Sequence, residues 1–166
     1  MFVLGIDPGL STTGYGLVAS EGVRLRAVAA GAIRTAPSLP DAPRLAELFA
    51  DLEALLVQYH PDEVALEQVF VNRNLQTATA VGRAVGVVLL AAARAQVPVF
   101  EYTPSAVKMA VTGSGDAAKD RVQALVARRL GLTAAPRPAD AADALAVAIC
   151  HLQSAGLRRA TAGAGR

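Results

Sequence analysis

Apolar residues in the first part of the chain gather in short runs that are typical of β-strands. Strands are predicted over Phe2 to Ile6, Gly14 to Ala19 and Val23 to Ile33, with a short turn between the last two. Asp-Pro-Gly and a Ser-Thr-Thr-Gly loop separate the first two runs, and this composition suits a tight turn. The chain is therefore expected to begin as a three-stranded antiparallel meander.

After this meander, helical patterns alternate with strand-like runs. Between Asp41 and His60, apolar residues recur at i, i+3, i+4 and i+7, which predicts an amphipathic helix. The further predicted elements are a strand from Glu63 to Glu67, a helix from about Asn74 to Ala95, a strand from Val97 to Tyr102, a short helix from Thr103-Pro104 to Gly113, a helix from Asp116 to Leu130 and a last helix from Pro138 or Ala139 to about Gly156. This order favours an α/β fold with a five-stranded mixed sheet and helices on both faces.

The length of 166 residues suits a single domain, which we place at residues 1–155. Residues 156–166 are basic and rich in small side chains, so we expect a disordered tail there. The longest strongly apolar run, Ala84 to Ala93, is shorter than the roughly 20 residues that span a bilayer. We interpret it as part of a buried helix and expect no membrane partner.

Several features favour a cytoplasmic protein. The N-terminus enters a strand directly, without the basic segment and cleavage site of a secretory signal. The single cysteine, Cys150, excludes an internal disulfide and agrees with a reducing compartment. The net charge of +2 and the isoelectric point near 9.0 are too mild for a nonspecific nucleic-acid coat.

Two acidic residues stand at the ends of buried strands. Asp7 follows the first strand and Glu67 ends the fourth, so both emerge at one edge of the sheet if these strands are parallel neighbours. Two nearby carboxylates repel each other, so that either one pKa rises or a cation binds between them. Turn formation is the alternative explanation for Asp7, and a solvated strand end is the alternative for Glu67.

The last predicted helix begins with Asp140 and Asp143, which lie three residues apart on one helix face. Capping and the helix dipole explain acids in a first turn well on their own. Together with Asp7 and Glu67, however, they make four carboxylates, the oxygen ligands that Mg²⁺ and Mn²⁺ prefer. Such a cluster supports an in-line displacement at a phosphodiester by two metal ions roughly 3.5–4 Å apart.

The chain contains fourteen arginines but only two lysines, Lys108 and Lys119, on either side of a Gly-rich TGSG segment. Lysine is favoured where a compact ammonium is required, although two residues are a small sample and coincidence is an equal alternative. Competing chemistry is poorly supported. His60 and His151 accompany no nucleophile motif, Cys150 and His151 lack zinc-site spacing, and no glycine-rich nucleotide-binding motif occurs.

Four segments of the chain closely resemble the RuvC Holliday-junction resolvases in their order and spacing. They are GIDPGLSTTGYGLV, ALEQVFVNRN, VPVFEYTPSAVKMAVTGSGDAAK and ADAADALAVAICH, and the resemblance covers about Phe2 to Leu152. It implies a ribonuclease H-like fold, a homodimer and nicking of two opposed strands of a four-way DNA junction during recombination and DNA repair. It further implies two Mg²⁺ or Mn²⁺ ions per site, a short preferred cleavage sequence and cooperation with the RuvA and RuvB branch-migration proteins.

The resemblance also implies roles for single residues. An acidic catalytic and metal-binding tetrad would consist of Asp7, Glu67, Asp140 and Asp143, with Lys108 and Lys119 near the scissile phosphate. Ammonium groups there would stabilise charge that develops in the transition state. Phe70 would stack at the crossover, in a DNA-binding loop that includes Arg73 and Asn74, and packing beneath this loop is the alternative for Phe70.

Three other functions fit the sequence less well. ATP-handling enzymes of the actin and sugar-kinase type share the Gly-x-Asp-x-Gly loop but need two such domains. A ribonuclease H-like nuclease acting on structured RNA shares the first motif without the QVF and DAADALA runs. A non-catalytic junction-binding module would not need all four acids.

Overall fold

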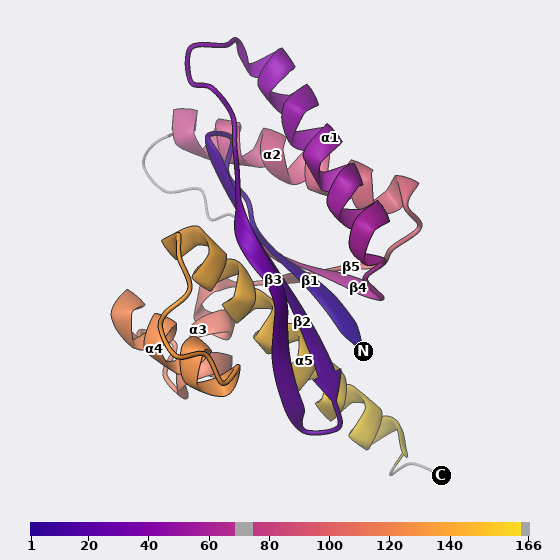
Figure 1. Ribbon diagram of the computed structural model, residues 1–166, viewed down its shortest axis with the longest axis vertical. Coiled ribbons are helices and arrows are strands. Elements are labelled where there is room, and N and C mark those ends of the chain that lie inside the picture. The colour runs from indigo at the N-terminus through magenta and orange to yellow at the C-terminus, as the bar shows by residue number, and fades with distance from the viewer. Residues whose placement is uncertain (69–74, 164–166) are drawn as a thin grey trace.

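The computed structural model describes residues 1–68 and 75–163, with side chains up to residue 156, arranged around one central sheet (Figure 1). The strands are β1 (Phe2–Asp7), β2 (Thr12–Glu21), β3 (Arg24–Arg34), β4 (Glu63–Glu67) and β5 (Val99–Tyr102), in the order β3-β2-β1-β4-β5. β1 is antiparallel to β2 and parallel to β4, and β5 is parallel to β4. The predicted five-stranded mixed sheet is confirmed.

Helices cover both faces of the sheet (Figure 1). One face carries α1 (Asp41–Tyr59) and α2 (Leu75–Arg94), and the other carries α3 (Pro104–Thr112), α4 (Lys119–Arg129) and α5 (Ala139–Gly163). Because side chains alternate along a strand, Leu4 and Ile6 of β1 join the core beneath α1 and α2, while Val3 joins the core beneath α5. The sheet therefore separates two hydrophobic cores.

Several predicted boundaries differ from the structure, the largest difference being at the C-terminus. The final helix does not end near Gly156 but continues to Gly163, into the segment expected to be disordered. Residues 157–162 are Leu, Arg, Arg, Ala, Thr and Ala, most of which favour helix, and Gly156 in the helix interior costs only about 1 kcal/mol. β5 begins at Val99 rather than Val97, since Pro98 has no N–H to donate to a strand ladder.

Helix α2 buries only a narrow stripe of its surface, formed by Ala84, Val88, Ala91 and Ala92. By length and composition alone it is the one helix within the described residues that could cross a membrane. The interpretation of Ala84 to Ala93 as a buried segment is correct for that stripe and wrong for the remainder, because Leu89 and Leu90 are 40% and 54% exposed. The described part of the chain thus leaves an apolar surface of α2 uncovered.

His151 attaches α5 to the parallel half of the sheet. Its imidazole is fully buried, with the Tyr102 hydroxyl 2.7 Å from Nδ1 and the Glu63 carboxylate in contact with Nε2. The Phe100 ring lies 4.8 Å from the imidazole, measured between ring centroids. These contacts show that His151 has a packing role in the fold. The sequence alone had indicated no role for it.

Candidate active site

Asp7 and Glu67 are brought together by the parallel pairing of β1 with β4. Ile6 is paired with Leu66, so the two acids occupy equivalent positions at the ends of adjacent strands. Both carboxylates therefore leave the sheet at the same edge. This is the arrangement that the sequence predicted if the two strands were parallel neighbours.

Glycines of β1 and β2 allow α5 to lie directly on the sheet. Gly14 is paired with Asp7, and a Cβ atom at Gly14 would stand 2.1 Å from the backbone oxygen of Asp140. At Gly5, a Cβ atom would stand 2.1 Å from the backbone oxygen of Ala144. Non-bonded atoms do not approach each other this closely, so a larger residue at either position would displace α5. The close approach places the first turns of α5, which carry Asp140 and Asp143, beside the end of β1.

A cavity of about 270 Å³ lies where these elements meet. Its polar lining consists of Asp7, Glu67, Asp143, Lys108 and Lys119, and its apolar lining of Pro104, Val107, Val122 and Ala146. Lys119 Nζ lies 2.6 Å from Asp143 Oδ2. Five of the residues predicted from the sequence thus line one cavity, contributed by β1, β4, α3, α4 and α5.

Burial and mutual repulsion change the acidity of the carboxyl groups. Burial raises the pKa of Asp7 to about 7, and the negative charges of Glu67, Asp143 and Asp140 add to this increase. Burial, followed by the charge of Asp143, also raises the pKa of Glu67. The hydrogen bond with Asp143 raises the pKa of Lys119. The cavity therefore concentrates negative charge where water solvates it poorly, which favours a bound cation.

The donor chemistry of the cavity fits a hard divalent cation, because carboxylate oxygens are the ligands that such cations prefer. As the side chains are oriented, no three His, Cys, Asp or Glu residues of the described chain form a group that could hold a metal ion. In this arrangement the Lys119 ammonium contacts Asp143 directly. Asp7, Glu67 and Asp143 are the residues that would hold the cation, after a rearrangement of side chains.

Asp140 contributes charge rather than lining the cavity. It belongs to the first turn of α5, which begins at Ala139, so it does not precede the helix as an N-cap residue would. Its carboxylate raises the pKa of Asp7 and of Lys119 through space. A favourable interaction with the helix dipole remains an alternative for its position. The predicted DNA-binding residues Phe70, Arg73 and Asn74 lie outside the described residues.

The sequence profile of the family described as "Crossover junction endodeoxyribonuclease RuvC" matches residues 3–151 of the chain. The chain belongs to the RuvC family. The crossover junction endodeoxyribonuclease RuvC of Syntrophomonas wolfei is 54% identical over 154 residues, which is 93% of this chain and 90% of that protein. That of Heliobacterium modesticaldum is also 54% identical over 154 residues, 93% of this chain and 95% of that protein.

Solved structures agree with the RuvC assignment. "Thermus thermophilus RuvC structure" superposes with a TM-score of 0.88 at 41% identity, covering 95% of this chain and 96% of that one. "T. thermophilus RuvC in complex with Holliday junction substrate" has a TM-score of 0.89 at 41% identity, covering 93% and 94%. The predicted family and the ribonuclease H-like RuvC fold are both confirmed.

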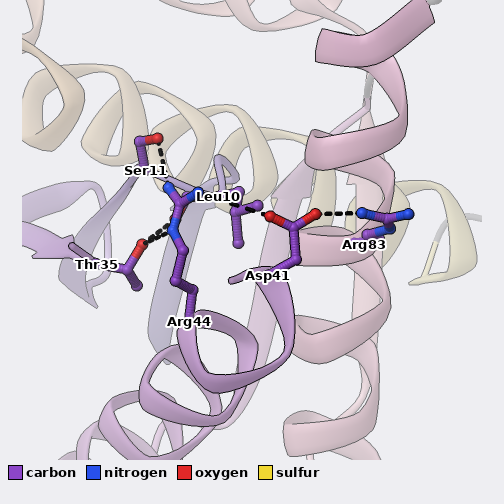
Figure 2. A network of polar contacts seen from close by, with 6 residues as sticks. All are labelled: Leu10, Ser11, Thr35, Asp41, Arg44 and Arg83. Carbon is purple, nitrogen blue, oxygen red and sulfur yellow. Dashed lines mark hydrogen bonds and ion pairs between the residues drawn. The ribbon is translucent and has the colours of Figure 1, made fainter. Parts of the chain in front are cut away.

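In this RuvC-family chain, a buried arginine holds the loop that follows Asp7 (Figure 2). Arg44 donates from Nε to Thr35 Oγ1 at 3.0 Å and from Nη2 to Ser11 Oγ at 2.6 Å. The Thr35 hydroxyl in turn donates to the Leu10 carbonyl at 2.6 Å. The loop between β1 and β2 is therefore fixed to the end of β3 and to α1.

The same arrangement reaches α2 through Asp41 (Figure 2). Asp41 Oδ1 lies 3.7 Å from Arg44 Nη1, and its other oxygen contacts Arg83 of α2. Sequence reasoning missed this network, because Arg44 falls at the start of an amphipathic helix where a charged residue is ordinarily exposed. The only signal in the sequence for its burial is that Arg44 lies on the same helix stripe as the apolar residues Leu48 and Leu52.

Proposed function

We propose that this chain is a structure-selective DNA endonuclease that resolves Holliday junctions by paired, metal-dependent nicks in two opposed strands. The observation that carries the proposal is the cavity in which Asp7, Glu67 and Asp143 meet Lys108 and Lys119, in a chain of the RuvC family. Carboxylates suited to hard cations, placed beside ammonium groups suited to phosphate, form a site for phosphodiester hydrolysis.

The acids and the lysines have separate roles in this proposal. Asp7, Glu67 and Asp143 would hold the cations, and Asp140 would add negative charge beside them. Two bound Mg²⁺ or Mn²⁺ ions would supply activation of water and neutralisation of charge at the phosphate. Lys119 neutralises Asp143 in the protein alone. If a bound cation took its place at Asp143, the Lys119 ammonium would act with Lys108 on the charge that develops on the phosphate.

We further propose that the chain acts as a homodimer that uses the exposed apolar side of α2. Leu75, Leu89 and Leu90 are 72%, 40% and 54% exposed there, and burial of such residues favours association. A two-fold dimer would present two sites to two opposed strands. Leu90→Glu should give monomers in sedimentation at micromolar concentration, and a dimer of unchanged stability would contradict this interface. Ala84 is unsuitable for such a test, since it is fully buried in the core.

Other parts of the proposal rest on family resemblance. They are a cytoplasmic location, cooperation with the RuvA and RuvB branch-migration proteins, and contact of Phe70, Arg73 and Asn74 with DNA at the crossover. Stacking of an aromatic ring on a base contributes roughly 1–3 kcal/mol, so Phe70 would help to select a junction over a duplex.

A cleavage assay with three substrates tests the proposed function. The substrates are a mobile four-way DNA junction, a linear duplex containing the same sequence and a four-way RNA junction, each with EDTA, Mg²⁺ or Mn²⁺. We expect paired nicks in opposed strands of the DNA junction alone, and only with a divalent cation. Preferential cleavage of RNA would favour a structured-RNA nuclease, and binding to the junction without cleavage under any condition would favour a non-catalytic module.

A further inference from the structure

A basic groove lies at the opposite end of the β2–β3 hairpin from the active-site cavity. We call it the arginine groove, a depression of about 500 Å³ whose charged lining consists of Arg24, Arg26, Arg128, Arg129 and Glu21. The first two arginines come from β3 and the next two from the last turn of α4. Four positive charges thus meet one negative charge.

The arginines of this groove differ from others in the chain by their lack of carboxylate partners. Within residues 1–68 and 75–156, none of the four forms an ion pair, whereas Arg44, Arg83 and Arg94 each pair with an acid. All four arginines of the groove are exposed. Uncompensated guanidinium groups gathered at one place attract an anionic partner.

One further donor extends the groove. A neighbouring cavity of about 340 Å³ shares Arg129 with it and adds the Ser20 hydroxyl, while the Gln153 amide there accepts from Arg129 Nη1 and donates to the Ala110 carbonyl. Arginine binds phosphate through paired N–H groups, and hydroxyl side chains also contact phosphate oxygens. The combined surface therefore has the chemistry of a site for a phosphate backbone rather than for a single small anion.

The position of the arginine groove relative to the cavity is set by α4 and β2. Lys119 and Val122 line the cavity, and Arg129 lines the groove. These residues share one stripe of α4, and the helix from Lys119 to Arg129 is about 15 Å long at 1.5 Å per residue. Along β2, the groove residue Glu21 stands seven positions beyond Gly14, the partner of Asp7, which is about 23 Å.

We infer that the arginine groove binds the phosphate backbone of a duplex arm of the DNA whose cleaved strand occupies the cavity. This inference rests on the proposed function, because it takes DNA as the substrate. The phosphates of one strand are spaced at about 3.4 Å along the duplex axis, so an arm that runs from the cavity to the groove meets the groove about four to seven nucleotides from the cleaved bond. Such contacts fix the direction of the arm and carry no sequence information.

The test measures junction affinity in EDTA with arms of two lengths, about 15 and about 4 base pairs, the shorter closed by hairpin loops. The variants are Arg128→Gln and Arg129→Gln, with Arg94→Gln as a control that removes the same charge from the last turn of α2. Glu21→Gln provides a test of opposite sign. Thermal melts verify that every variant is folded, and wild-type cleavage of the long-armed junction in Mg²⁺ is recorded in parallel.

For the wild type, we expect shortening of the arms to weaken binding by about three- to tenfold. Arg128→Gln and Arg129→Gln should each weaken binding to long arms by about two- to threefold, reduce the effect of arm length and lower the salt slope by about 1. Glu21→Gln should tighten binding, and Arg94→Gln should match the wild type.

Two results would overturn the inference. The first is that the wild type cleaves the junction while the groove variants bind it with wild-type affinity and wild-type dependence on arm length. The groove would then not bind DNA, and an acidic protein would be the better candidate for its partner. If the wild type neither binds nor cleaves the junction, the proposed function fails and the inference fails with it.

Discussion

Lys119 Nζ lies 2.6 Å from Asp143 Oδ2 and joins the start of α4 to the first turns of α5. The lysine side chain is 58% exposed, whereas that of the aspartate is 21% exposed. The ammonium therefore approaches from the solvent side and neutralises one member of a crowded acidic group. A divalent cation bound by Asp143 must compete with this internal cation.

Lys119→Met should separate metal binding from catalysis. Affinity for Mn²⁺ should rise by about two- to fivefold, since an exposed ion pair is worth up to about 1 kcal/mol. Single-turnover cleavage should fall by about 100-fold, because an ammonium group near the phosphate is lost. Calorimetric titration with Mn²⁺ measures the first effect and a junction assay the second.

Lys108→Met is the matched control, because Lys108 lines the same cavity without an ion pair to a carboxylate among the described residues. It should reduce cleavage while leaving Mn²⁺ affinity nearly unchanged. Weaker Mn²⁺ binding by Lys119→Met would show that the two cations do not compete.

The raised pKa of Asp7 makes the stability of the metal-free protein depend on pH. The folded state keeps a proton on Asp7 up to about pH 7, whereas the unfolded state releases it near 3.8. Asp7 therefore destabilises the fold progressively as the pH rises from about 4 to 7. Asp7→Asn should raise the melting temperature by a few degrees at pH 8, where the wild-type group is charged, and by nothing near pH 3.

Thermal melts in EDTA across this pH range measure the effect, and junction cleavage by Asp7→Asn should be lost throughout. Equal melting temperatures of the two proteins at pH 8 would show that neither burial nor the neighbouring carboxylates destabilise the charged form of Asp7 in the metal-free fold.

Gly14→Ala should damage the site by moving α5. The added methyl group would overlap the Asp140 backbone oxygen, so the helix must shift or the fold must loosen. We expect a loss of about 1–3 kcal/mol in the free energy of unfolding together with a large loss of cleavage. Chemical denaturation and the junction assay give the two values.

Gly86→Ala is the control for this substitution. A Cβ atom there meets nothing within 4 Å, and alanine favours the interior of α2. Stability should rise by about 0.5–1 kcal/mol. A Gly14→Ala protein as stable and active as the wild type would contradict the close approach of α5 to β2.

Arg44→Met should destabilise the loop that follows Asp7. Thr35 and Ser11 lose their donor inside the protein, and we expect about 2–4 kcal/mol of lost stability by denaturant unfolding. Arg83→Met removes a more exposed partner of Asp41 and should cost less than about 1 kcal/mol. Equal effects of the two substitutions would mean that the buried contacts of Arg44 contribute no more than a surface ion pair.

The sequence predicted the parts of the fold that follow from local pattern. Helix α1 begins at Asp41, as its apolar spacing indicates, and the strands that carry Asp7 and Glu67 are the expected parallel neighbours. Acids at the ends of buried strands are conspicuous because an unpaired buried charge is costly. For this reason, the central residues of the site could be predicted from the sequence alone.

The remaining features depend on contacts between distant segments, which local pattern does not encode. The glycines at positions 5 and 14 are common residues in a strand-turn sequence, and their function becomes visible only when α5 lies across them. The pairing of Lys119 with Asp143 and the burial of Arg44 likewise join segments far apart in the chain. The extension of α5 to Gly163 is not evident from the sequence, because Gly156 is typical of a helix end although alanine and arginine follow it.

The most direct test of the central claim is single-turnover cleavage of a four-way DNA junction by Glu67→Gln in saturating Mn²⁺, measured beside its binding affinity. Glu67 ends β4 beside Asp7 and lines the cavity, and its replacement removes a ligand charge while keeping the shape of the side chain. We expect junction binding within about threefold of the wild type and a cleavage rate reduced by at least about 100-fold. Cleavage at the wild-type rate by the folded variant would show that these acids are not the site of the reaction.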